Sequence, residues 1–206
     1  MVTKNIQTQR KARGRPSSFD RETALMAAMC LFWDRGYEGT SFDDLTAVMG
    51  ISASSFYNSF GSKEALYHEA IDAYARQAGA WFVAALEAGQ TTADAFRALF
   101  EAAACAFTRC DSPSGCMIAS AATQCSPAQS RLKELMIEQR RLAEDAMKQR
   151  LALGVEAGDL APTTDLDALA GYFSTVMQGL GIQARDGASR EKLIEIGHMA
   201  LSVFKQ

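Results

Sequence analysis

The chain has 206 residues, a formal net charge of −3, 48% hydrophobic residues and 22% charged residues. These fractions are typical of an ordinary globular protein, and alanine-rich stretches with only four prolines predict an all-α protein. No stretch approaches the roughly 18 consecutive apolar residues of a membrane span, and no apolar segment follows the charged opening residues, which argues against a signal peptide. We therefore expect a cytoplasmic protein whose five cysteines, an odd number, are thiols.

Positive charge is concentrated at the N-terminus. Residues 1–21 hold six basic residues and one acidic residue, a net charge of +5, which leaves −8 for residues 22–206. This asymmetry predicts a flexible basic arm, residues 1–18, that contacts phosphates while an acidic body keeps the protein in solution. A solvated tail without a binding role is the alternative that composition alone leaves open.

Three helices are expected between residues 19 and 61, each opened by a polar cap and closed by a glycine. The expected caps of the first two are Ser18 or Asp20 and Thr40 or Ser41, and the closing glycines are Gly36, Gly50 and Gly61. The apolar positions expected to face inward are Leu25, Met29, Phe32 and Trp33, then Leu45, Val48 and Met49, and finally Phe56 and Phe60.

Six further helices are expected, about nine in all, with no internal repeat and no convincing strand. The fourth begins after Ser62 and is longer than those before it. The others are expected from Thr91 or Thr92 to about Arg109, from near Cys116 to Gln124, from Ser126 and Pro127 to Gly158, from Thr163 or Thr164 to about Arg185, and from Ser189 to near Lys205.

The second and third helices match a helix-turn-helix at about residues 41–60. Gly50 permits the sharp turn, Ile51 anchors the turn to the core, and the following helix needs an outer face without bulky apolar groups to enter a major groove. That face is formed by Ser52, Ala53, Ser54, Ser55 and Asn58. On the hairpin alone, a helical hairpin of an enzyme would fit equally well.

The surrounding residues resemble the DNA-binding domain of the TetR/AcrR family of transcription regulators. Residues 35–71 read RGYEGTSFDDLTAVMGISASSFYNSFGSKEALYHEAI, and a weaker resemblance continues to VMQGLGIQARDGASREKL near the C-terminus. The matching positions are Gly36, Thr40, Ser41, Leu45, Gly50, Ile51, Ser52, Ser54, Ser55, Phe56, Tyr57, Phe60, Ser62, Lys63, Glu64 and Leu66. The resemblance implies a three-helix DNA-binding domain at residues 19–66 and a helical ligand-binding and dimerisation domain at residues 67–206.

The resemblance also implies which side chains contact the DNA backbone. Tyr57 and Ser55 are similar to the family's phosphate contacts, and Lys63 would hold a phosphate at the start of the fourth helix. Ser41 would do the same at the start of the second helix. Two departures from the family pattern lower the expected affinity for DNA. Ser59 stands where the family often has His or Tyr, and Asp43 and Asp44 place negative charge near the expected position of the DNA backbone.

Sequence readout is expected from the rest of the third helix. Ala53, Ser54 and Asn58 would approach base edges, with Asn58 able to form a bidentate contact with adenine and Ala53 limited to a thymine methyl group. Arg13-Gly14-Arg15-Pro16 in the arm is similar to an AT-hook core, in which both arginines enter a narrow A·T minor groove. A nonspecific phosphate-binding tail remains the alternative for the arm.

The second half predicts a regulatory domain whose details the sequence leaves open. A family member would bind an inducer, here unknown, and would dimerise through the last two helices on a palindromic operator of double-stranded DNA, here with A·T-rich flanks. Candidates for lining a ligand pocket include Phe100, Phe107, Met117, Tyr172 and Met177, which could equally be core residues.

Cys116 is a candidate redox or electrophile sensor, because it follows Gly115 and precedes a helix, where a thiol becomes more reactive. A buried structural thiol is the alternative.

Zinc, other metals and cofactors are not expected, since no C-x-x-C occurs and both histidines lie elsewhere. An enzyme is disfavoured because the common nucleophile, zinc and nucleotide motifs are missing, and a protein-binding adaptor would leave the arm and the Tyr57 to Lys63 segment unexplained. We therefore expect an inducible bacterial repressor.

Overall fold

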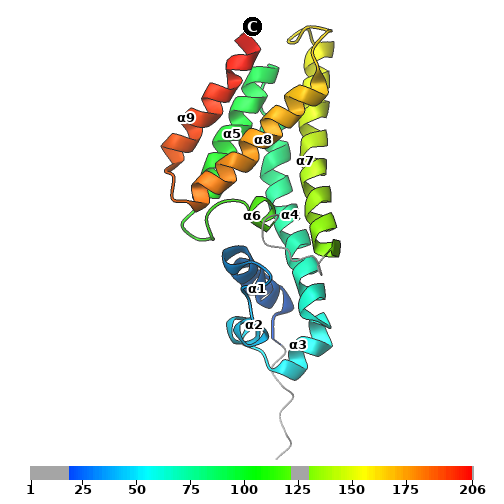
Figure 1. Ribbon diagram of the computed structural model, residues 1–206, viewed down its shortest axis with the longest axis vertical. Coiled ribbons are helices and arrows are strands. Elements are labelled where there is room, and N and C mark those ends of the chain that lie inside the picture. The colour runs from blue at the N-terminus through cyan, green and yellow to red at the C-terminus, as the bar shows by residue number, and fades with distance from the viewer. Residues whose placement is uncertain (1–18, 122–129, 206) are drawn as a thin grey trace, which may run out of the picture.

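The computed structural model describes residues 19–121 and 130–205 (Figure 1). Within these residues every regular element is helical, as the composition predicts. The helices are α1 (Arg21–Arg35), α2 (Phe42–Met49), α3 (Ala53–Phe60), α4 (Lys63–Glu87), α5 (Thr92–Phe107), α6 (Met117–Ala121), α7 (Ser130–Glu156), α8 (Leu166–Arg185), α9 (Arg190–Ala200) and the 3-10 helix η2 (Leu201–Lys205).

The molecule is elongated, with a long helix joining its two ends. Helices α1, α2 and α3 lie at one end, α5, α7, α8 and α9 form a bundle at the other, and α6 lies between them (Figure 1). Helix α4 runs from the first group into the second and contributes buried residues to two separate hydrophobic cores. The first core includes Leu66 through Tyr74 of α4 as well as Met117 and Met136. The first core thus continues past residue 66, and the domain boundary expected there stays a prediction.

Local signals set the helix ends in the first half. The side chain of Asp20 accepts the backbone N–H of Glu22 at the start of α1, and Gly36, Gly50 and Gly61 end α1, α2 and α3 with positive φ angles of 72°, 64° and 74°. A non-glycine residue would be strained at such angles. The expected caps and stops of this half are therefore confirmed.

Two expectations about helices differ from the structure. The sequence pattern places Val48 inward with Leu45 and Met49, but its side chain is 46% exposed, because Leu45 and Met49, four residues apart, already occupy the face of this short helix that packs on the core. The expected end of the ninth helix near Lys205 instead consists of the separate 3-10 helix η2. The predicted helix start at Ser126 and Pro127 lies outside the described residues.

Close helix packing in the second half depends on a small residue. A Cβ atom added at Gly197 of α9 would lie 2.6 Å from the Cβ of Phe100 on α5. Glycine therefore allows α9 to approach α5 closely at Phe100, whose ring centroid lies 5.8 Å from that of Phe173 on α8. In residues 19–121 and 130–205, no helix is long and apolar enough to span a membrane.

Candidate nucleic-acid interface and regulatory cavity

Helix α3 presents one polar face to solvent. Phe56 and Phe60 are 0% and 4% exposed and hold the helix against α1, α2 and α4, as predicted. The opposite face exposes small or polar side chains, with Ser55 half-buried at its edge. The exposed residues are Ser52, Ala53, Ser54, Tyr57 and Asn58. The helix can therefore enter a groove without moving its buried side chains.

Three serine hydroxyls are organised at the N-terminus of α3. The Oγ of Ser52 accepts the backbone N–H of Ser55 at 3.2 Å, which caps the helix. The same oxygen lies 3.0 Å from the hydroxyls of both Ser54 and Ser55. Ser52 therefore holds the hydroxyls of Ser54 and Ser55 together at the start of α3, and each hydroxyl keeps hydrogen-bonding capacity beyond this contact.

Tyr57 is the largest exposed side chain on this face, and its ring is supported from behind. The ring stacks on that of Phe42 at a centroid distance of 5.2 Å and an angle of 19°. The side chain remains 57% exposed. Phe42 therefore fixes the direction in which the Tyr57 hydroxyl can meet a phosphate.

The start of α2 is occupied by a capping box. The Ser41 hydroxyl donates to the Asp44 carboxylate at 2.6 Å, the Ser41 backbone N–H donates to the same carboxylate at 3.1 Å, and the Asp44 N–H donates to Ser41 at 3.0 Å. The bonds from Ser41 hold the pKa of Asp44 below its ordinary value, and Arg35 at 3.5 Å adds to the effect. Ser41 must therefore release Asp44 before it can donate to a phosphate.

All three basic residues of residues 19–66 have partners within the protein. Lys63 lies 4.3 Å from the ring centroid of Tyr37, and burial lowers its pKa. Arg21 lies over Phe60 and pairs with Glu69 at 2.7 Å, while Arg35 pairs with Asp44.

The net charge of residues 19–66 is negative, which disfavours binding to the negatively charged backbone of DNA. Residues 19–66 hold three basic and seven acidic residues, a net charge of −4, whereas residues 1–18 hold five basic residues and no acidic ones. The folded domain therefore offers shape and polar groups, and the sequence places the available positive charge in the arm. The arm, including Arg13 and Arg15, lies outside the described residues.

A cavity of about 310 Å³ lies in the second half, between α4, α6, α7 and α8. Of the five pocket candidates, Phe107 and Met177 line this cavity. Phe100 and Met117 are not on its wall; they are 0% and 1% exposed and pack in the two cores. Tyr172 is 43% exposed and lines a separate pocket of about 420 Å³ that also includes Phe204. The apolar periodicity of the sequence predicted that these residues face inward, but it could not distinguish residues that line the cavity from residues that pack in the hydrophobic cores.

Cys116 also lines the cavity and is half-buried. Tyr74 lies beside it, and burial raises the pKa of Tyr74 well above its ordinary value, with Cys116 adding to the rise. A Cβ atom at Gly181 of α8 would lie 3.0 Å from the Cβ of Cys116, so the chain at Cys116 packs tightly against α8. Cys125, the neighbouring thiol in sequence, lies outside the described part of the chain.

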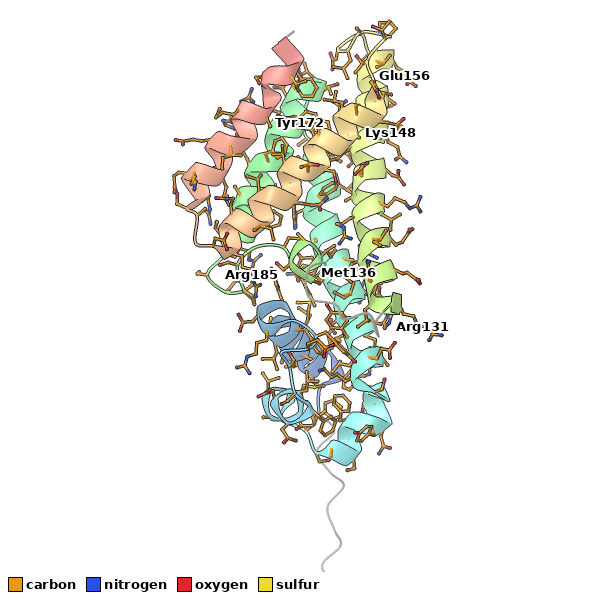
Figure 2. All side chains as sticks on the ribbon, in the orientation of Figure 1. Arg131, Met136, Lys148, Glu156, Tyr172 and Arg185 are labelled. Carbon is orange, nitrogen blue, oxygen red and sulfur yellow. The ribbon has the colours of Figure 1, made fainter. Side chains whose placement is uncertain are left out.

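A side chain that the sequence did not single out joins the two halves. Arg185, at the end of α8 nearest α1 (Figure 2), donates to the carbonyl of Trp33 at 2.9 Å and to the carbonyl of Asp34. These carbonyls belong to the last turn of α1, which has no intrahelical donors for them. The nearest sequence signal is a basic residue at the end of a predicted helix, which gives no indication of a partner about 150 residues away.

Helices α8 and α9 also carry exposed apolar side chains. Tyr172 and Ile182 of α8 are 43% and 38% exposed, and Met199 of α9 is 75% exposed. Gly179 lies on the exposed side of α8 and has open space around its Cα. In the part of the chain that the structure describes, no group of three or more His, Cys, Asp or Glu residues could hold a metal ion.

An exposed helix-turn-helix on a helical body with an apolar cavity defines a DNA-binding regulator. A family model for bacterial regulatory proteins of the tetR family matches residues 24–70, and one for the tetracyclin repressor-like C-terminal domain matches residues 92–194. The chain is 34% identical to the HTH-type transcriptional repressor ComR of Escherichia coli over 207 residues, covering 100% of this chain and 99% of ComR.

Solved structures agree with these matches. The TetR family transcriptional regulator CifR, in a cysteine mutant complexed with 26bp double-strand operator DNA, is 36% identical with a TM-score of 0.88, covering 92% of this chain and 98% of CifR. A regulator from Chloroflexus aurantiacus is 25% identical with a TM-score of 0.81, covering 90% and 94%. The chain belongs to the TetR family. It is a DNA-binding transcription regulator and not an enzyme.

Proposed function

We propose that this regulator is a repressor that binds a palindromic operator as a homodimer and releases it when its regulatory half is modified or binds a ligand. The polar, exposed face of α3 carries the DNA-binding part of this proposal. The similarity to CifR, which was captured on operator DNA, supports it.

The α3 face divides into base-reading and phosphate-binding groups. Ala53, Ser54 and Asn58 read base edges. Of the three, only Asn58 has an amide that can form a bidentate contact with adenine. Ser52 caps the helix and keeps Ser54 and Ser55 close to the groove.

Phosphate contacts come from side chains around that face. Tyr57 and Ser55 donate from α3, Lys63 donates from the start of α4, and Ser41 donates from the start of α2 after releasing Asp44. Lys63 lies over the Tyr37 ring, and a phosphate would draw its ammonium away from this contact.

Arg13 and Arg15 supply the charge that the folded domain lacks. With five basic residues in the arm against a net charge of −4 in residues 19–66, the arm is needed to neutralise phosphates. Insertion of both arginines into an A·T-rich minor groove beside the operator satisfies this need and adds preference for A·T-rich flanks.

The homodimer forms through α8 and α9. Tyr172, Ile182 and Met199 are large apolar side chains on the outer side of these helices, and a second copy would bury them in a four-helix arrangement. Gly179 lets the two α8 helices approach closely.

Induction acts through the cavity and its link to α1. Cys116 lies at the cavity wall and against Gly181, one turn before Arg185 bonds to α1. An adduct on Cys116, or an inducer in the cavity, would displace α8 and loosen α1, and with it the position of α3.

The DNA-binding part is tested by mobility shift of the full chain on palindromes from the DNA upstream of its own gene. We expect salt-sensitive binding, and deletion of residues 1–16 should reduce the slope of log affinity against log salt by roughly 0.9 for each lost phosphate contact. Failure to bind any such palindrome would refute the repressor. An unchanged slope would refute the role of the arm.

The thiol part is tested by treating the operator complex with a quinone. We expect release from the wild-type chain and no release from Cys116→Ser, with Cys105→Ser, an exposed thiol away from the cavity, as the matched control. Release from Cys116→Ser would exclude this cysteine as the sensor.

A further inference from the structure

The cavity wall is largely apolar, with a few neutral polar side chains and one cationic side chain. Trp81 and Phe82 of α4, Phe107 of α5 and Met177 of α8 provide large apolar surfaces. Among the described residues that line the cavity, Arg140 of α7 is the only one with a charge. A volume of about 310 Å³ falls at the small end of the roughly 300–1,000 Å³ typical of small-molecule sites.

Arg140 is incompletely paired. Its Nη1 atom is buried and has no hydrogen-bond partner, and no ion pair joins Arg140 to an acidic residue in the described chain. The next residue, Arg141, differs in both respects: it is 61% exposed and pairs with Glu138 at 2.9 Å and with Asp145 at 3.6 Å. A buried guanidinium nitrogen without an acceptor is costly, and Arg140 belongs to the cavity wall, so a turn of its side chain toward the cavity would bring Nη1 to an acceptor on a ligand.

The other polar groups of the cavity wall do not require a charged partner in the same way. The Oγ atom of Ser174 accepts the side-chain amide of Gln178 at 3.2 Å, so these two residues satisfy each other in part. Gln139 and Tyr74 are neutral, and none of the described residues that line the cavity has a carboxylate to repel an anion. Arg140 is therefore the group that would select the charge of a ligand.

Part of the apolar wall reaches solvent. Val83 of α4 and Leu142 of α7 both line the cavity, and they are 48% and 50% exposed. A ligand in the cavity contacts mainly apolar side chains, which favours a molecule with an apolar body over a small inorganic anion.

We propose that the cavity binds an organic acid, with its carboxylate on Arg140 and its apolar body against Trp81, Phe82 and Met177. The inference deepens the proposed function, because it names the chemical class of the inducer of this regulator. Binding pairs the guanidinium with a carboxylate and removes the apolar body from water, so both parts of the molecule contribute.

The test is isothermal titration calorimetry of the full chain with two acids and their neutral amides at about pH 7, where the acids are ionised. The probes are phenylpropionate and octanoate, with phenylpropionamide and octanamide as isosteres. We expect at least one acid to bind about tenfold more tightly than its amide, as expected for a hydrogen-bonded ion pair that is partly removed from water.

Two variants assign the effect to one side chain. Arg140→Met should abolish the preference for the acid while keeping the melting temperature equal or higher, since an unpaired buried polar atom is removed. Arg141→Met, the matched control, should keep the preference, because Arg141 is exposed and paired outside the cavity.

The outcomes separate this inference from the proposed function. Equal affinity for acid and amide, retention of the preference in Arg140→Met, or no binding of either acid at millimolar concentration would overturn the inference, even if the chain still bound its operator. Binding of an acid through Arg140 without any operator binding would leave the inference standing and would overturn the repressor instead.

Discussion

The DNA-binding half and the regulatory half are held together by contacts of different range. In the first half, helix ends depend on residues three or four positions apart, as in the Ser41 and Asp44 capping box, and the candidate interface is a run of adjacent residues on α3. In the second half, the cavity collects residues from α4, α5, α6, α7 and α8, and Arg185 reaches carbonyls about 150 residues earlier. A substitution on the exposed face of α3 can therefore alter one contact at a time. A substitution in the cavity wall also alters how the helices around it pack.

The two halves also differ in how they use positive charge. The cations of residues 19–66 are each held by an acid or an aromatic ring, whereas Arg140 in the regulatory half leaves a buried nitrogen without a partner. In the proposed function, the DNA-binding half therefore depends on the arm for positive charge. In the half proposed to bind a small anion, the one charged residue among the described residues of the cavity wall has a guanidinium nitrogen without a partner.

The largest effect should come from the inner side of α3. Phe56→Ala should lower the free energy of unfolding by about 3–5 kcal/mol, because Phe56 is fully buried and its loss leaves a cavity. Urea denaturation measures this. Tyr57→Phe, one residue away and exposed, should keep the unfolding midpoint within error; comparable losses in the two variants would break the division of α3 into an inner and an outer face.

Close packing in the regulatory half should give the next effect. Gly197→Ala should destabilise the protein by about 1–3 kcal/mol, because the new Cβ would overlap Phe100 at 2.6 Å. Gly79→Ala on α4, where nothing lies within 4 Å, is the control and should be neutral or stabilising in the same thermal melt. If Gly197→Ala is as stable as Gly79→Ala, α9 does not pack on α5 as described.

Removing the link between the two halves should lower the stability by a smaller amount. Arg185→Met should cost about 1 kcal/mol and increase amide hydrogen exchange in the last turn of α1, because two carbonyls lose their donor. Arg190→Met is the matched control, since Arg190 bonds to Thr108 within the regulatory half. Equal exchange in α1 for both variants would show that Arg185 does not couple the halves.

Acidification should have the smallest effect. The pKa of Asp44 is lowered in the folded protein, so the stability it contributes is present above the ordinary pKa of 3.8 and is lost as the pH falls through the lower folded value. Asp44→Asn should lower the unfolding midpoint at neutral pH and reduce its loss below about pH 4. A variant with the same acid dependence as wild type would contradict the role of the capping box.

The first half of the fold follows from the sequence more completely than the second, for a physical reason. Caps and positive-φ glycines are local features, so the helix ends at Asp20, Gly36 and Gly50 can be predicted from the neighbouring residues alone. Wall and core residues share the same apolar periodicity, so Phe107 could not be separated from Phe100. The partners of Arg185 and the unpaired nitrogen of Arg140 depend on how distant helices meet, which no local pattern records.

The most direct test of the central claim measures operator affinity by fluorescence anisotropy over a set of single base-pair substitutions. Asn58→Ala should lose about 1–3 kcal/mol of discrimination at particular base pairs, whereas Tyr57→Phe should weaken binding to all of them about equally. If both variants keep the wild-type affinity and the wild-type base preference at every position, the exposed face of α3 is not the surface that reads DNA.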